Sequence, residues 1–216
     1  YDRPVKRQEN DEVQKLIEEM ALTEVDTQNP GYLTKQDTSD SAYAKLMAMA
    51  GLESVKEAII SKSAAAEFAR KRRAAGLPTA PINLHSCFLG GPGTGKTTVA
   101  RLIGRIYKEN GLLSSGHLVE ESRQTLVGMY SNTEAETVAE AVAKAEGGIL
   151  LIDDAHNLFV QDDNKDQGRM ILEYLKAEIS NKDKNDWMLI LAGPEEEMTK
   201  LLNHNKSLQS HISNKF

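Results

Sequence analysis

Eight consecutive residues constrain the fold of this 216-residue chain more than any other segment. Residues 90–97 read Gly-Gly-Pro-Gly-Thr-Gly-Lys-Thr and match the pattern G-x-x-x-x-G-K-[ST] in full. The apolar run 82–89 comes directly before them, and a helical pattern over 96–109 follows. A strand, a glycine-rich loop and a helix in this order predict a site where backbone N–H groups and the helix dipole face phosphate groups. We call residues 90–97 the phosphate loop.

Each polar residue of the phosphate loop has a predicted role. Lys96 is expected to reach the β- and γ-phosphates of a nucleotide, and the Thr97 hydroxyl is expected to bind Mg²⁺. Nucleotide contacts are expected along the loop and into the first turn of the helix, from Gly91, Pro92, Gly93, Thr94, Gly95, Lys96, Thr97 and Thr98.

A second motif, Gly-Gly-Ile-Leu-Leu-Ile-Asp-Asp, covers residues 147–154. Its four apolar residues predict a buried strand that delivers Asp153 to the carboxyl edge of a sheet, where Mg²⁺ would be bound. Asp154 is the candidate to polarise the attacking water, so Lys96, Asp153 and Asp154 are the predicted catalytic residues. Many ATPases have glutamate at the position of Asp154. Aspartate sets the carboxylate about 1.5 Å back, and a misplacement of about 1 Å can cost ~10²-fold in rate. A simple cap of the strand end is the alternative for Asp154.

Strands and helices alternate along most of the chain. Apolar runs predict strands over 82–89, 118–120, 149–152 and 187–192, and helices are predicted over 41–49, 53–75, 96–109, 133–145, 167–179 and 195–202. Continuous apolar strands between helices predict an α/β fold, with a parallel sheet flanked by helices. Residues 41–216 are expected to form one nucleotide-binding domain. Residues 1–40, polar apart from a short helical pattern over 11–20, are expected to be a linker or arm.

Composition limits the classes of partner that the chain can bind and the cellular compartment that suits it. The formal net charge is −6, which gives no general attraction to nucleic acid, and no apolar run approaches the roughly 20 residues that cross a bilayer. The one cysteine, Cys87, lies within an apolar strand pattern, which favours a buried thiol and a reducing, cytoplasmic compartment. Because the chain begins at Tyr1 rather than methionine, we expect it to be part of a longer protein.

The nucleotide is expected to be ATP. Guanine-specific proteins with this loop carry an Asn-Lys-x-Asp element, and residues 181–184 read Asn-Lys-Asp-Lys, with lysine in the last position. A small-molecule kinase would share the loop. However, no arginine-rich lid segment is present, and the Asp153–Asp154 pair after a buried strand favours an ATPase.

Together these segments carry a family resemblance. From about residue 44 to residue 216 the chain resembles AAA+ ATPases, and within them the CbxX/CfqX branch, which includes red-type rubisco activase. The segments that match are the phosphate loop and residues 51–56, 119–123, 126–130, 149–154 and 192–198.

The resemblance implies further roles. Gly51 and Leu52 would lie against adenine, and Tyr130 would grip an extended polypeptide in a central pore, with an ordinary packed tyrosine as the alternative. The arginine finger, worth about 10³–10⁵ in kcat, falls on His211, whose side chain is shorter than that of arginine. Residues 192–193, Ala-Gly, lack the polar side chain with which many members sense the γ-phosphate. A helical lid domain is expected after Phe216, so this chain would be truncated before the lid, bind nucleotide more weakly and be monomeric alone.

Two functions follow from the resemblance and the departures from it. The first is Mg²⁺-dependent ATP hydrolysis that remodels protein substrates in a ring, formed by copies of the protein or by other AAA+ domains of its chain. The second is a catalytically weak nucleotide-binding module in a multi-AAA+ protein, which Asp154 and His211 favour. Neither function involves a membrane or nucleic acid.

Overall fold

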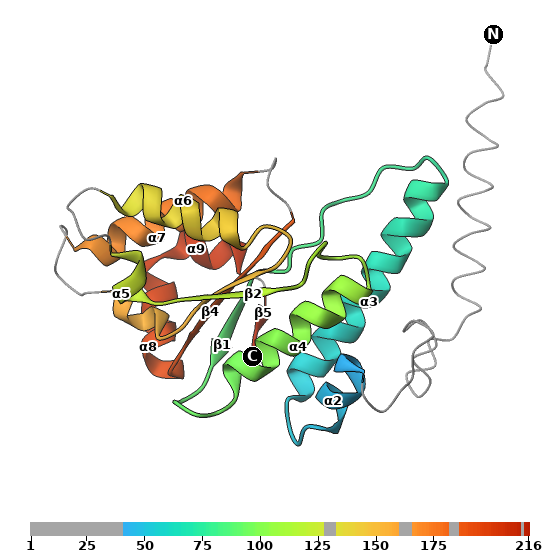
Figure 1. The fold of residues 1–216 in the computed structure, drawn as a ribbon, viewed down its shortest axis with the longest axis horizontal. Coiled ribbons are helices and arrows are strands. Elements are labelled where there is room, and N and C mark those ends of the chain that lie inside the picture. The colour runs from blue at the N-terminus through green and yellow to red at the C-terminus, as the bar shows by residue number, and fades with distance from the viewer. Residues whose placement is uncertain (1–40, 128–132, 160–165, 182–185, 213) are drawn as a thin grey trace, which may run out of the picture. The chain divides into compact units, whose positions relative to one another are not determined.

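A computed structural model of the chain describes residues 41–127, 133–159, 166–181, 186–212 and 214–216 (Figure 1). Within these ranges five parallel strands form one sheet in the order β2-β3-β4-β1-β5. The predicted α/β fold with a parallel sheet is confirmed. The strands are β1 (Ser86–Leu89), β2 (Leu118–Glu121), β3 (Ile149–Ile152), β4 (Met188–Gly193) and β5 (Asn214–Lys215).

Helices cover both faces of this sheet (Figure 1). On one face pack α2 (Ala42–Ala48), α3 (Glu53–Ala74) and α4 (Lys96–Glu109). On the other pack α5 (Arg123–Leu126), α6 (Glu134–Lys144), the 3₁₀ helix η1 (Ala155–Leu158), α7 (Gln167–Ser180), α8 (Glu195–His204) and α9 (Lys206–His211).

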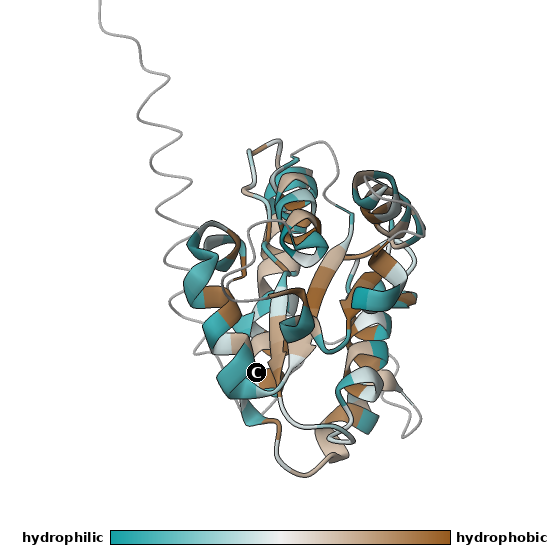
Figure 2. Ribbon diagram, turned by 90° about the vertical axis from the view of Figure 1, so that its left-hand side faces the viewer, coloured by the Kyte–Doolittle hydropathy of each residue, from teal (hydrophilic) through white to brown (hydrophobic). Residues whose placement is uncertain are grey.

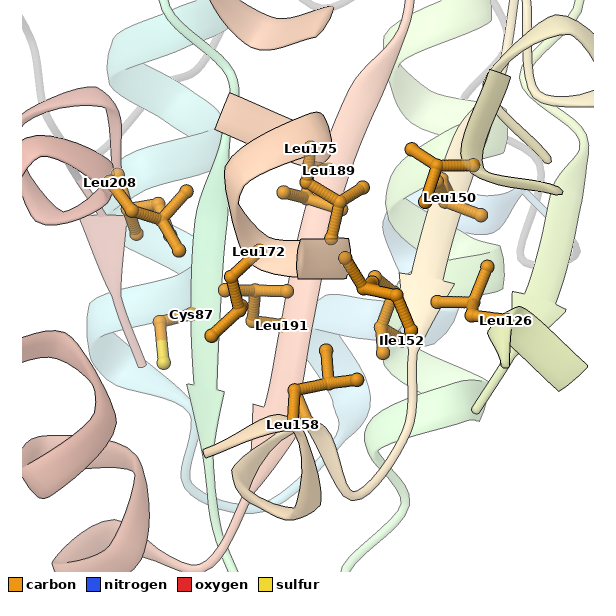
Figure 3. Packing of buried hydrophobic residues seen from close by; sticks show 14 of the residues in the cluster. Cys87, Leu126, Leu150, Ile152, Leu158, Leu172, Leu175, Leu189, Leu191 and Leu208 are labelled. Atoms are coloured by element: carbon orange, nitrogen blue, oxygen red, sulfur yellow. The ribbon is translucent and has the colours of Figure 1, made fainter. Parts of the chain in front are cut away.

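The two central strands explain the layered arrangement. Every residue of β3 and β4 is buried, and side chains along a strand alternate between the two faces. Leu150 and Ile152 therefore join one apolar cluster, which Figure 3 shows with Leu158 and Leu172, while Ile149 and Leu151 join the other. Figure 2 shows the hydrophobic strands between helices that carry both hydrophobic and hydrophilic residues. A parallel sheet that is apolar on both faces requires helices on both.

The structure corrects two predictions from the sequence. The first strand covers only β1, because Asn83 bonds outside the ladder: its Nδ2 donates to the carbonyl of His211 (2.7 Å), and its Oδ1 accepts from the N–H of His85 (3.0 Å). No element was predicted after the helix over 195–202, but α9 and β5 follow it. The helix predicted over 11–20 and the proposed arm, 1–40, lie outside the described residues.

Helix α4 approaches the segment before β2 so closely that only glycine fits at the contact. A Cβ atom added to Gly104 in α4 would overlap the carbonyl oxygen of Gly116, and one added to Gly116 would overlap that of Gly104. This contact fixes α4 against the segment that leads into β2. Because the phosphate loop runs directly into α4, the contact also helps to position the loop. In the part of the chain that the structure describes, no helix combines the length and the apolar character needed to cross a membrane.

Candidate nucleotide-binding site

The phosphate loop connects β1 to α4. Gly93 and Gly95 have φ angles of 76° and 86°, in the left-handed region that glycine tolerates and other residues disfavour. The N–H of Gly90 donates to the carbonyl of Gly193 (2.9 Å), and the Thr94 hydroxyl donates to the carbonyl of Gly91 (2.9 Å). The loop is therefore a defined turn, anchored to β4, that ends at the N-terminus of a helix.

Lys96 lies across this turn. Its Nζ donates to the carbonyl oxygens of Gly90 (3.0 Å) and Gly91 (2.8 Å), and the residue is half-buried. An ammonium has three N–H donors, so a third remains beyond these two bonds. The predicted phosphate-binding lysine thus holds its charge at the loop itself.

Both aspartates of the second motif follow β3 at the edge of the sheet where the phosphate loop begins. Register pairs Leu89 with Gly193 and Ile152 with Leu191, so β1, β3 and β4 end at this same edge. The N–H of Asp153 donates to the carbonyl of Glu121 (2.9 Å), and the N–H of Asp154 donates to Oδ1 of Asp153 (3.0 Å).

Both aspartates are exposed at this edge, and Asp154 has a left-handed backbone, with φ 47° and ψ 42°. Thr97, half-buried, and Thr98, exposed, lie in the first turn of α4. The structure thus gathers Lys96, Thr97, Asp153 and Asp154 at one edge of the sheet.

A cavity of about 480 Å³ opens beside the phosphate loop. Lys96 and Thr94 of the phosphate loop line it, and the other lining residues are mostly apolar: Leu52, Glu53, Ser54, Val55, Phe88, Leu89, Val99 and Phe216. This volume is typical of small-molecule sites, and apolar walls that lead to a cation suit a flat base joined to phosphates. Leu52, which the resemblance places against adenine, lines the cavity. Gly51 precedes it with a φ of 69° but is not among the lining residues.

Two phenylalanines that line this cavity, Phe88 and Phe216, were not predicted as site residues from the sequence. Phe216 follows β5, where its N–H donates to the carbonyl of Cys87 (2.9 Å) and its carbonyl accepts from the N–H of Leu89 (2.6 Å). Its ring lies edge-on to Phe88, with centroids 5.8 Å apart. Because Phe216 follows the polar residues Asn214 and Lys215, no apolar run marks the strand that brings it to the cavity.

Residues that could hold a metal are few. Within the described ranges no group of three or more His, Cys, Asp or Glu side chains could hold a metal ion. Mg²⁺ usually keeps several waters and binds one or two carboxylates together with substrate phosphates. Asp153 and the Thr97 hydroxyl fit that donor set, so they could hold Mg²⁺ that arrives with a nucleotide.

One predicted site residue is outside the described ranges, and another does not line the cavity. Tyr130 falls outside the described residues. His211 ends α9 and does not line the cavity: its carbonyl accepts from Asn83, and its Nε2 lies 3.3 Å from the Ser180 hydroxyl at the end of α7.

Comparison with known proteins agrees with this architecture. Residues 86–213 match the family described as "ATPase family associated with various cellular activities (AAA)". The chain is 37% identical over 166 residues to "Protein cbbX homolog, chloroplastic" of Guillardia theta, covering 77% of this chain and 44% of that protein. It is 39% identical over 168 residues to "Stage V sporulation protein K" of Bacillus subtilis, covering 78% and 52%. It is 35% identical over 164 residues to a "Ribulose bisphosphate carboxylase/oxygenase activase, chloroplastic" of Cyanidioschyzon merolae, covering 76% and 56%.

The chain spans about half the length of these curated relatives. The family match covers more than half of this chain, and two of the relatives, named cbbX and activase, belong to the branch that its motifs resemble. The chain belongs to the AAA ATPase family, as a CbxX-like AAA+ domain.

Proposed function

We propose that this domain binds ATP together with Mg²⁺, hydrolyses it, and in its full-length protein drives the remodelling of protein substrates. Membership of the AAA family implies ATP binding. The observation that carries the proposal is the cavity, which joins apolar walls at Leu52, Phe88 and Phe216 to the ammonium of Lys96.

The residues of the site divide the proposed chemistry between them. Lys96 would exchange its bonds to the loop carbonyls for phosphate oxygens and neutralise their charge. Thr97 and Asp153 would hold Mg²⁺, which supplies further stabilisation of the charge that develops on the phosphates. Asp154 would orient the attacking water from the end of β3.

Protein substrates and a ring assembly are proposed from the relatives. One of them is named as an activase of ribulose bisphosphate carboxylase/oxygenase, so that relative acts on another protein. In such an assembly Tyr130 would contact the substrate polypeptide, and His211 would occupy the position from which a finger residue reaches a neighbour's nucleotide. The substrate of this protein would be a polypeptide.

A catalytically weak nucleotide-binding module is the second candidate. Asp154 places its carboxylate one methylene closer to the backbone than glutamate would. His211 has its ring nitrogen beside Ser180 rather than a guanidinium that could extend outward. Under this proposal ATP would hold an assembly together without being turned over quickly.

ATP binding and turnover of the full-length protein separate the two candidates. Lys96→Ala should weaken ATP binding about 30-fold, because hydrogen bonds to charged groups contribute about 1.5–3 kcal/mol. Lys71→Ala is the matched control, since its ammonium pairs with Glu67 on the exposed surface of α3. An unchanged affinity of Lys96→Ala would remove the basis of both candidates.

Asp154→Glu and His211→Arg then decide between hydrolysis and binding alone. If the wild type turns ATP over at about 1 s⁻¹ or faster and neither change raises kcat, the weak-module candidate is rejected. If the wild type binds ATP but hydrolyses it far more slowly, and Asp154→Glu raises kcat, hydrolysis as the native activity of this domain is rejected.

A further inference from the structure

His156 contains a buried ring nitrogen that has no hydrogen-bond partner in the part of the chain that the structure describes. Among the described residues, its Nδ1 is buried and makes no hydrogen bond, although 22% of the side chain is exposed. Buried polar atoms are nearly always paired in native proteins, so an orphaned one calls for an explanation. No pattern in the sequence marks this residue.

The orphaned nitrogen lies inside the candidate site. His156 belongs to η1, and its Nδ1 is 4.0 Å from Oδ1 of Asp154. Gly193, at the end of β4, also lies close to Nδ1, and its carbonyl accepts the N–H of Gly90 in the phosphate loop. Nδ1 therefore lies close both to the carboxylate predicted to orient water and to the strand end that anchors the phosphate loop.

Gly193 leaves the space that the imidazole uses. A Cβ atom added there would lie 3.0 Å from Nδ1 of His156 and 2.9 Å from Sδ of Met198. Contacts that short require a neighbour to move. The absence of a side chain at Gly193 thus lets the ring of His156 and the side chain of Met198 lie against the end of β4.

Asp154 has a hydrogen-bonded backbone N–H and a side chain that is exposed to solvent. Its φ of 47° is a conformation that aspartate tolerates better than most residues, and its N–H is bonded to Oδ1 of Asp153. Its side chain is 57% exposed. A charge-assisted N–H···O bond is about 2.8 Å long, so a side-chain rotation that shortens the present gap by about 1.2 Å would form one.

We propose that the Nδ1–H group of His156 donates to the carboxylate of Asp154 when nucleotide is bound, and so positions it for the attacking water. This inference rests on the proposed hydrolysis of ATP. His156 is a positioning residue, because it acts on Asp154 and not on the nucleotide. A neutral imidazole has one N–H, so the inference assigns the proton to Nδ1 and leaves Nε2 as the acceptor. The lateral bond would fix the direction of a carboxylate that is shorter than glutamate.

The tautomer of His156 provides a test that does not depend on turnover. In the ¹⁵N-histidine-labelled chain, saturated with Mg²⁺ and a slowly hydrolysed ATP analogue, the Nδ1 and Nε2 shifts of His156 report which nitrogen is protonated. The signal is assigned by its loss in His156→Asn. We expect a protonated Nδ1, with a downfield proton that shifts in Asp154→Ala.

Two results would overturn the inference without touching nucleotide binding: a proton on Nε2 alone, or a signal that Asp154→Ala leaves unchanged. Calorimetry on the same sample shows whether the analogue binds. If it does not bind, the proposed function and the inference both fall. If it binds and Nδ1 carries no proton, only the inference falls.

Steady-state kinetics of matched variants test the same bond. His156→Leu keeps much of the side-chain volume without a donor, and should lower kcat about tenfold to 10²-fold with KM within about twofold. His156→Asn places an amide N–H₂ close to the position of Nδ1, and should keep kcat within about twofold of the wild type. In an Asp154→Asn background, His156→Leu should cause no further loss. Equal kcat in His156→Leu and wild type, or equal losses in the leucine and asparagine variants, would refute the positioning role.

Discussion

His85 is held neutral by its surroundings. Its Nδ1 accepts a hydrogen bond from the N–H of Leu189 (3.0 Å), and its ring lies edge-on to Trp187 with centroids 5.4 Å apart. Burial, and secondarily the charge of His211, lower its pKa to about 4. The acceptor role at Nδ1 requires the neutral ring, so His85 is a structural residue that ties the segment before β1 to β4.

Acid should destabilise the domain through His85. The pKa of His85 in the folded protein lies below the ordinary value of 6.5. Its contribution to the free energy of unfolding is therefore complete above pH 6.5 and is lost as the pH falls toward 4, because between these values the unfolded chain takes up the proton far more readily than the folded one. At pH 5 the free energy of unfolding should drop by about 2 kcal/mol through this group. Urea unfolding at pH 7.5 and pH 5 measures the change.

His85→Asn is the control for this pH effect. The Oδ1 of the introduced asparagine can still accept the N–H of Leu189, but an asparagine side chain does not titrate. The difference in stability between the two pH values should be about 2 kcal/mol smaller in this variant. The same pH dependence in both proteins would show that His85 is not the titrating group.

At the scale of elements, α4 is positioned by glycine. Gly104→Ala should destabilise the domain by about 1–3 kcal/mol or more, despite the higher helix propensity of alanine, because the added Cβ would meet the carbonyl of Gly116. Gly111→Ala is the comparison, since it has a φ of 69° but open space around the missing Cβ. It should cost only about 1–2 kcal/mol of backbone strain. Thermal or urea unfolding ranks the two, and a smaller loss for Gly104→Ala would contradict the close contact.

A second prediction concerns Phe216, which directly follows β5. Phe216→Ala removes an apolar wall of the cavity and its contact with Phe88, and should weaken ATP binding about 5- to 10-fold, a change typical of lost aromatic packing. Calorimetric titration measures the affinity. Phe68→Ala, on the exposed surface of α3, is the control and should bind like the wild type. Equal affinities of Phe216→Ala and Phe68→Ala would place the base elsewhere.

The sequence predicted those elements that are determined by residues close together in the chain. The phosphate loop, the buried run of β3 and the helical pattern of α4 could be read from sequence, because glycine spacing and apolar periodicity determine them. Asp153 followed from the end of such a run. Neither β5 nor His156 could be found in this way. The strand β5 is two residues long and exists through pairing with β1, and the environment of His156 depends on Gly193, which is 37 positions along the chain. Contacts between distant segments leave no periodic signal.

At the scale of the whole molecule, the cavity joins elements from both ends of the described domain. Leu52 precedes α3, Phe88 lies in β1, Lys96 begins α4, and Phe216 follows β5. A ligand that contacts all of these segments stabilises the fold that brings them together. Nucleotide binding and folding should therefore be linked.

Mg²⁺ and ATP should stabilise the whole domain against unfolding. At a free ligand concentration of 100 times Kd, the free energy of unfolding should rise by about 2.7 kcal/mol. Melting curves with increasing ATP follow this rise. Lys96→Ala should melt near the wild-type temperature without ligand but show little increase at the same ATP concentrations. An equal increase in both proteins would mean that ATP stabilises the domain from another site.

The place of β1 in the sheet also sets an order of assembly during synthesis. β1 lies between β4 and β5, so the first of the described strands to leave the ribosome pairs with the two that emerge last. Pairing across such sequence separations closes long loops and slows folding. Residues 86–89, with the apolar Cys87 and Phe88, must stay unpaired on both edges until β4 appears. The nascent domain would therefore pass through a stage in which β2 and β3 can pair while the strand before the phosphate loop waits, a stage at which a chaperone could bind it.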